Sequence, residues 1–300
     1  MPPVSCGSSA LSPVIQSFFH AATNTWSHLV SNGDGTAAAV IDPVLDFDPA
    51  SGRISTESAQ ALIAAVHAHR LRVEWLLETH AHADHLTAAD WLRRELAAEG
   101  HPARTAIGAG IVAVQQHWKS VFDLGEDFAA DGSDFDHLIA DGEHLPLGDL
   151  LIEALATPGH TSDGMSYRVG DAVFVGDTVF SPAAGTGRCD FPGGDAAQQF
   201  RSIQRLYALP EATRLFLCHD YPPRDAEPRE AVDLVEQRSG NAQLRRDTDE
   251  SDYVARRRAR DATLPVPRLL YPALQVNIRA GRLPPPAGNG TAYLRIPLRV

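Results

Sequence analysis

The sequence has few cysteines, no long apolar run and a deficit of basic residues. Only Cys6, Cys189 and Cys218 occur, an odd number at wide spacing, so no disulfide framework is expected. No stretch approaches the roughly 20 consecutive apolar residues that a membrane-spanning helix needs. The formal net charge is −12, which disfavours nucleic acid and anionic lipid as partners. We therefore expect a cytoplasmic protein that binds neither.

The composition is that of a globular protein. The 300 residues are 44% hydrophobic and 21% charged, which excludes extensive disorder and low complexity. Residues 1–19 carry no basic residue ahead of their apolar part, so they do not resemble a secretory signal. At roughly 150 residues per domain the length is compatible with one domain or two.

Hydrophobic periodicity predicts an alternation of strands and helices. Short runs rich in strand formers are expected as strands at 14–19, 26–30, 37–41, 73–78, 150–156, 172–175 and 215–218. Segments with apolar residues at helical spacing are expected as helices at 56–70, 84–98, 196–209 and 249–262. The acidic, glycine-punctuated segment 119–135 is expected as a loop, and the segment 264–272 is rich in proline.

Polar residues follow four of the expected strands. The sequence THAHADH (79–85) follows the fourth strand, and His160, Asp177 and His219 follow three later ones. In α/β sheets ligands bind beyond the carboxyl ends of strands. One site assembled from loops far apart in the sequence is therefore expected.

The residue types at these positions predict a metal site. Within 79–85, His80, His82, Asp84 and His85 fall within six positions. Imidazole and carboxylate are suitable ligands for zinc, iron and manganese, and a short turn can direct several of them to one point. Histidines elsewhere, such as His20, are interpreted as packed or solvated side chains.

The HxHxDH motif at 80–85 resembles that of the metallo-β-lactamase superfamily, whose later ligands match His160, Asp177 and His219. The resemblance extends from about residue 14 over most of the chain. It implies an α/β fold, an αββα sandwich of two mixed β-sheets flanked by helices. It further implies a single domain over 1–300, with a C-terminal extension at about 240–300 packing on the core, and it is compatible with a homodimer.

Two subgroups of the superfamily use these ligands differently. In the hydrolases, a residue matching Asp177 bridges two zinc ions, and a bridging hydroxide attacks a thioester or amide carbonyl. The resemblance implies one zinc on His80, His82 and His160, and the other on Asp84, His85 and His219. In persulfide dioxygenases a single Fe(II) is held by the residues matching His80, His160 and Asp177, with positions left open for substrate and O₂. The other four residues then orient ligands or form a second metal site.

Two segments resemble the bacterial persulfide dioxygenases in particular. They are 176–223, with Gly187-Arg188, Asp190-Phe191 and His219-Asp220-Tyr221, and 259–281. The resemblance implies a non-haem iron persulfide dioxygenase that oxidises glutathione persulfide, or a similar small persulfide, with O₂ to sulfite and thiol. The alternatives are a binuclear zinc thioester hydrolase of the glyoxalase II type and a metal-binding protein without turnover.

The same resemblance suggests how the substrate is held. Arg188 is expected to contact a carboxylate of glutathione, because guanidinium pairs bidentately with carboxylate. Asp190 and Tyr221 are candidate partners for amine and amide groups. A structural salt bridge between Arg188 and Asp190 is the alternative interpretation. Thr186 stands where many relatives carry a cysteine, and Cys218 is expected to be buried beside His219.

Overall fold

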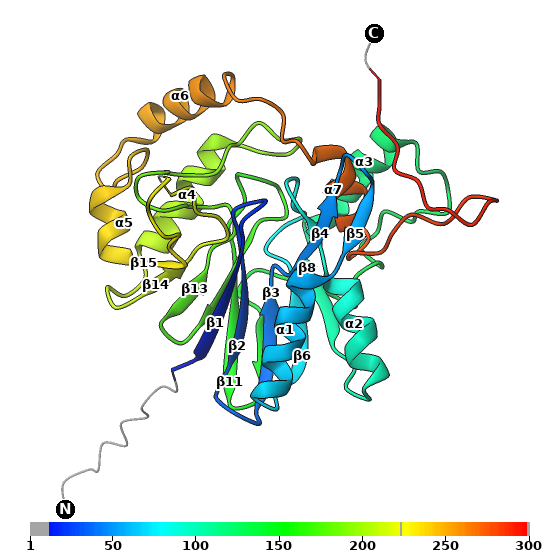
Figure 1. Ribbon diagram of the computed structural model, residues 1–300. Coiled ribbons are helices and arrows are strands. Elements are labelled where there is room, and N and C mark those ends of the chain that lie inside the picture. Colours follow the sequence, from blue (N-terminus) through cyan, green and yellow to red (C-terminus); the bar gives the residue numbers. More distant parts are fainter. Residues whose placement is uncertain (1–11, 223, 299–300) are drawn as a thin grey trace, which may run out of the picture.

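Two β-sheets face each other, with helices on their outer sides (Figure 1). The computed structural model describes residues 12–222 and 224–298. Residues 1–11 lie outside this range, and they include Cys6 and most of the segment compared above with a secretory signal. Among the described residues no helix is both long and apolar enough to cross a bilayer.

Both main sheets have six strands and mixed direction. The first contains, in spatial order, β1 (Val14–His20), β2 (Thr25–Ser31), β3 (Ala37–Ile41), β6 (Arg72–Leu77), β8 (Arg104–Gly108) and β9 (His137–Ile139). The second contains β10 (His144–Leu147), β11 (Leu150–Ala156), β12 (Met165–Val169), β13 (Ala172–Phe174), β14 (Arg214–Phe216) and β15 (Ala231–Asp233). A small third sheet has the order β5 (Arg53–Ser55), β4 (Val44–Asp48), β7 (Leu86–Thr87).

Seven helices of the described chain cover the two outer sides (Figure 1). On the side of the first sheet lie α1 (Glu57–Ala68), α2 (Ala89–Ala98), α3 (Ile111–Phe122) and α7 (Leu270–Asn277). On the side of the second lie α4 (Ala196–Tyr207), α5 (Leu234–Gly240) and α6 (Glu250–Asp261). The expected αββα sandwich is confirmed.

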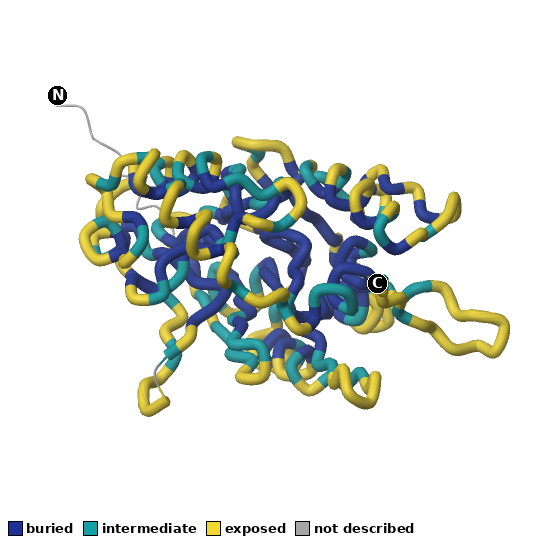
Figure 2. The backbone as a smooth tube through the Cα atoms, turned by 90° about the horizontal axis from the view of Figure 1, so that it is seen from above, coloured by how far each residue is buried: buried dark blue, intermediate teal, exposed yellow. Residues whose placement is uncertain are grey.

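Alternation along the strands builds the layers. In β3, Ala39 and Ile41 belong to the core between the two sheets, whereas Ala38 and Val40 belong to the cluster under α1 and α2. Burial on both faces explains why this strand is apolar throughout. The tube view shows the resulting buried interior beneath exposed helices, and a projecting exposed segment near the C-terminus (Figure 2).

Two sequence expectations about elements were wrong, and one proline-rich segment turns out to include a helix. The helix expected from residue 84 begins at Ala89, because Leu86 and Thr87 pair with β4 instead. Part of the loop expected at 119–135 belongs to α3. The proline-rich segment 264–272 runs into α7, which accommodates Pro272 because the first turn of a helix has no intrahelical use for its N–H groups.

His28 on β2 gives stability a pH dependence. Its ring is buried, accepts a hydrogen bond from the Ser17 hydroxyl (2.9 Å) and donates one to the Leu217 carbonyl (3.0 Å). Burial lowers its pKa from 6.5 to about 4. The unfolded chain therefore takes up this proton at higher pH than the folded protein does. Stability is lost as pH falls from 6.5 towards 4, by about 3 kcal/mol in total.

We expect His28→Gln to remove this part of the pH dependence. The measurement is urea unfolding of the wild type and the variant across the same pH interval. Both proteins are metal-free, because the release of a bound metal at low pH would itself change the free energy of unfolding. The difference between the two proteins isolates His28. Parallel stability curves would mean that His28 does not titrate differently in the two states.

Candidate metal centre

The loops that follow β6, β11, β13 and β14 meet at one edge of the sandwich. They carry the motif at 80–85, His160, Asp177 and His219 respectively. The structure thus brings these side chains, which come from loops far apart in the sequence, into one cluster. The cluster divides into two groups, each with ligand atoms within 4.8 Å of one another.

The first group consists of His80, His160 and Asp177. The His160 Nε2 atom lies 3.5 Å from Asp177 Oδ2, and the His80 and His160 ring centroids are 5.0 Å apart. His80 and His160 are buried, and the Asp177 side chain is 11% exposed. Two imidazoles and one carboxylate are thus brought to one point.

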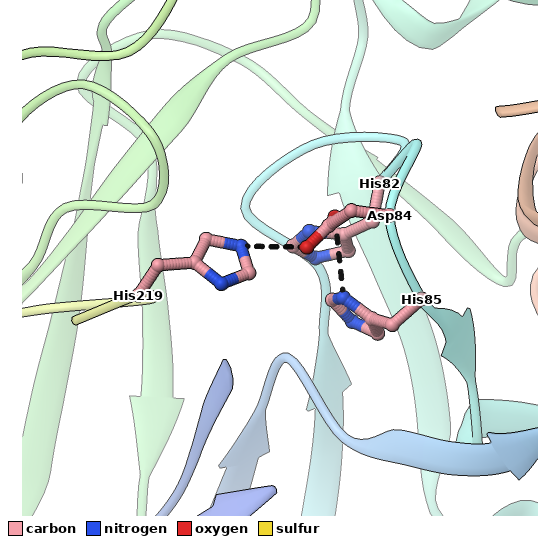
Figure 3. Close-up of side chains that lie close together, drawn as sticks. All are labelled: His82, Asp84, His85 and His219. Atoms are coloured by element: carbon pink, nitrogen blue, oxygen red, sulfur yellow. Dashed lines mark ion pairs between the residues drawn. The ribbon is translucent and has the colours of Figure 1, made fainter. Parts of the chain in front are cut away.

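The second group consists of His82, Asp84, His85 and His219 (Figure 3). His219 Nε2 lies 3.2 Å from Asp84 Oδ2, and His85 Nδ1 lies 3.4 Å from Asp84 Oδ1. His219 Nε2 is also 3.3 Å from Asp177 Oδ1. Asp177 therefore directs one oxygen towards each group.

Four of the histidines have one ring nitrogen held by a neighbouring acceptor. The partners are Thr79 Oγ1 for His80 (3.1 Å), Asp42 Oδ1 for His82 (2.9 Å), the Arg188 carbonyl for His160 (2.7 Å) and the Asn24 carbonyl for His219 (3.1 Å). Such bonds fix ring orientation and tautomer in metal sites and leave the second nitrogen for the ion.

Several buried polar atoms of the cluster have no hydrogen-bond partner. They are His82 Nδ1, both ring nitrogens of His85, His219 Nε2 and Asp177 Oδ1. Buried polar groups are normally satisfied, so an unpartnered set of nitrogen and oxygen donors fits a metal ion. The residues present therefore suit the metal that the sequence predicts, and imidazole with carboxylate is compatible with iron or zinc.

Burial keeps two of the rings in the form that binds metal. It lowers the pKa of His80 well below its ordinary value, and it lowers the pKa of His85 to about 4. For His219, burial acts in the same direction and is the largest single influence, but the neighbouring charges, with Asp84 and Asp177 among them, together outweigh it and raise the pKa. A metal ion must displace a proton from such a group, so metal binding is expected to weaken at low pH.

A cavity of about 660 Å³ opens onto the cluster. Asp84, His160 and Asp177 line its inner part, together with Arg188 and Tyr221 among the predicted substrate contacts. Asp190 is not among the lining residues. It holds Arg188 instead, with Oδ1 2.6 Å from Nε and Oδ2 2.7 Å from an Nη atom.

The Arg188 to Asp190 salt bridge that the sequence left as an alternative is thus present. Tyr221 is 52% exposed and its ring stacks on that of His219. Cys218 is buried next to His219, as expected.

Comparison with known families shows to which family the chain belongs. The family model described as the metallo-beta-lactamase superfamily matches residues 21–219, more than half of the chain. The chain belongs to this superfamily.

Individual relatives within the superfamily carry different names. A probable metallo-hydrolase of Burkholderia pseudomallei is 48% identical, covering 95% of this chain and 98% of its own length. Glyoxylase B2 of Dictyostelium discoideum is 43% identical, covering 87% and 88%. The mitochondrial persulfide dioxygenase ETHE1 of Bos taurus is 26% identical, covering 91% of each. The crystal structure of ETHE1 from Myxococcus xanthus superposes with a TM-score of 0.70 at 27% identity, covering 90% and 100%.

Sequence reasoning missed residues that support this metallo-β-lactamase site. Asp42 lies directly after β3, which is parallel to β6, so its carboxylate reaches the same sheet edge as the motif. The sequence could have indicated Asp42, because it is a polar residue directly after the strand expected at 37–41. Gln199 on α4 gave none, because the amphipathic pattern of that helix marks its buried face without saying what a buried amide contacts.

Gln199 ties together two ligand-bearing loops. Its side-chain oxygen accepts a hydrogen bond from the His160 backbone N–H (2.8 Å), and its amide nitrogen donates to the carbonyls of Asp177 (3.3 Å) and Thr178 (2.7 Å). The side chain is fully buried. One residue therefore fixes the distance between the loops of His160 and Asp177.

We expect Gln199→Leu to weaken metal binding by about 10- to 100-fold, because groups that orient ligands contribute on this scale. Competition with a chromophoric chelator measures the change. Gln198→Leu, at the neighbouring exposed position on α4, is the control and should bind metal normally. Unchanged metal affinity in Gln199→Leu would show that the two loops are held without this residue.

Proposed function

We propose that this protein is a non-haem iron persulfide dioxygenase. The observation that carries the proposal is the group of His80, His160 and Asp177 beside the cavity. Two histidines and one carboxylate on one side of a metal are the ligand set of non-haem Fe(II) oxygenases, and they leave positions open for substrate and O₂. The similarity to two proteins named ETHE1, one of them described as a persulfide dioxygenase, supports it.

The proposed reaction converts a persulfide, O₂ and water into sulfite and thiol. For glutathione persulfide, GSSH + O₂ + H₂O gives GSH + H₂SO₃, so the terminal sulfur is oxidised and O₂ is reduced. Held by His80, His160 and Asp177, Fe(II) would supply open coordination positions for the persulfide sulfur and O₂. The chain contributes the three ligands, and Arg188 and Tyr221 line the space for the rest of the substrate. A reducing cytoplasm is the proposed compartment.

A binuclear zinc thioester hydrolase is the second candidate, and the second group favours it. Asp177 lies close to both groups, and the unpartnered nitrogens of His82, His85 and His219 could hold a further ion. The similarity to glyoxylase B2 supports the same candidate. In this case the two groups of residues would hold two ions, which would supply an activated hydroxide for attack on the thioester carbonyl.

Oxygen uptake separates the two candidates. The purified chain is reconstituted anaerobically with Fe(II) and mixed with glutathione persulfide in an oxygen electrode. The proposal predicts uptake of one O₂ per sulfite formed, with about one iron per chain. Hydrolysis of S-lactoylglutathione by a protein holding two zinc ions, without oxygen uptake by the iron form, would overturn it. Activity towards neither substrate would favour a metal-binding protein without turnover.

A variant of the second group adds an independent readout. Under the dioxygenase proposal, His85→Ala retains about one metal per chain, because its iron is held by the other group. Under the hydrolase alternative the metal content falls from about two towards one. Elemental analysis of both proteins after identical loading gives the answer.

A further inference from the structure

Three arginines line the cavity at the metal centre: Arg188, Arg257 and Arg260. The protein as a whole is acidic, so cationic side chains concentrated at one cavity point to an anionic ligand there. Which of the three can bind a ligand depends on which guanidinium groups already have a carboxylate partner.

Two of the arginines are neutralised within the protein. Arg188 forms a two-pronged pair with Asp190 and also donates to the Pro265 carbonyl (2.7 Å). Arg257 is 3% exposed and donates to Asp261 and to the Thr186 carbonyl (3.0 Å). Their positive charges are compensated by neighbours that hold them in place.

Arg260 differs from both. It lies in the last turn of α6, three positions after Arg257 and therefore on the same side of the helix. It is exposed while lining the cavity, and it forms no ion pair with any carboxylate in the described part of the chain. An unpaired guanidinium facing a cavity presents a fork of N–H donors that matches a carboxylate.

We propose that Arg260 is an anion subsite that binds a carboxylate of the substrate at the mouth of the cavity. The substrate is then a small thiol derivative with a carboxylate at a distance from its reacting sulfur, rather than an uncharged persulfide. The reaction at the sulfur rests on the proposed function, but the subsite does not, because a thioester of the same thiol would carry the same carboxylate. Arg188 then acts mainly by holding the segment around Pro265 against the cavity.

Binding of an unreactive ligand tests the subsite. S-methylglutathione has the carboxylates of glutathione and no persulfide or thioester, and calorimetry on the metal-loaded protein measures its Kd. A charge-assisted pair implies that Arg260→Ala raises this Kd by about 10- to 100-fold. Arg260→Lys should recover part of the loss, because charge remains without the fork. Arg256→Ala is the control, an exposed arginine of the same helix outside the cavity lining.

Kinetics with two persulfides adds a second readout. Arg260→Ala should raise KM for glutathione persulfide and leave KM for the persulfide of 2-mercaptoethanol, which has no carboxylate, unchanged. Equal Kd values for S-methylglutathione in wild type and Arg260→Ala, or no binding by wild type, would overturn the subsite. Loss of binding in Arg260→Ala in a protein that consumes no oxygen would retain the subsite and reject only the dioxygenase reaction.

Discussion

Asp177→Ala is expected to lose its metal and to lower turnover by roughly a thousandfold or more, since a catalytic ion supplies several kcal/mol of transition-state stabilisation. Asp177 is the residue whose two oxygens face the two groups of ligands, 3.5 Å from His160 Nε2 and 3.3 Å from His219 Nε2. Its loss therefore affects the centre whether one ion or two are bound.

The measurement is metal content together with steady-state turnover of the persulfide and the thioester. Asp247→Ala serves as control, because this carboxylate is 82% exposed and pairs with Arg245 at the surface. It should retain metal and activity. A fully loaded Asp177→Ala protein with wild-type turnover would rule out a metal centre that includes this residue.

The positions of the candidate ligands could be predicted from the sequence because apolar runs indicate where the strands end. Apolar runs indicate β6, β11, β13 and β14, and the polar residues after them meet at one edge of the sandwich, to which β6 contributes from the first sheet and the other three strands from the second. The resemblance of the motif then supplied the sandwich. Neither argument needs knowledge of side-chain contacts.

The partner of the Arg188 side chain could not be predicted in this way. Sequence shows a cation two positions before an anion, and both a substrate contact and an internal pair are compatible with that spacing. The structure shows the internal pair, and the backbone just before it passes so close to the ligand loops that a Cβ at Gly187 would clash with the Asp177 carbonyl. This close approach fixes the course of the chain through Arg188 beside the ligand loops.

The cations of α6 were missed for a related reason. The sequence predicts a charged helix at 249–262, and most of the polar side chains of α6 are exposed. The pattern does not reveal that one side of the helix faces the cavity. Packing against α4 brings Arg257 inside and Arg260 to the rim, and this contact joins segments about 50 residues apart.

Asp42→Ala is expected to destabilise the fold by about 3 to 5 kcal/mol, the range for breaking a buried charged pair by removing one partner. Asp42 is 2% exposed and accepts hydrogen bonds from His82 Nε2 (2.9 Å), the Thr79 backbone N–H (2.7 Å) and the Thr79 hydroxyl (2.9 Å). Burial alone would raise its pKa, but His82 and these bonds hold the pKa below its ordinary value. The carboxylate is therefore charged, and both of its oxygens accept hydrogen bonds.

Urea unfolding of metal-free protein measures the loss, so that weaker metal binding does not contribute. Asp42→Asn keeps the shape and one acceptor oxygen, and it should lie between wild type and Asp42→Ala. Asp48→Ala, on the exposed end of β4, should change stability little. If Asp42→Ala unfolds at the same urea concentration as wild type, the bonds to His82 and Thr79 do not stabilise the loop. Metal affinity should fall along the same series, because Asp42 fixes the ring of His82 and leaves its Nδ1 atom directed at the second group of ligands.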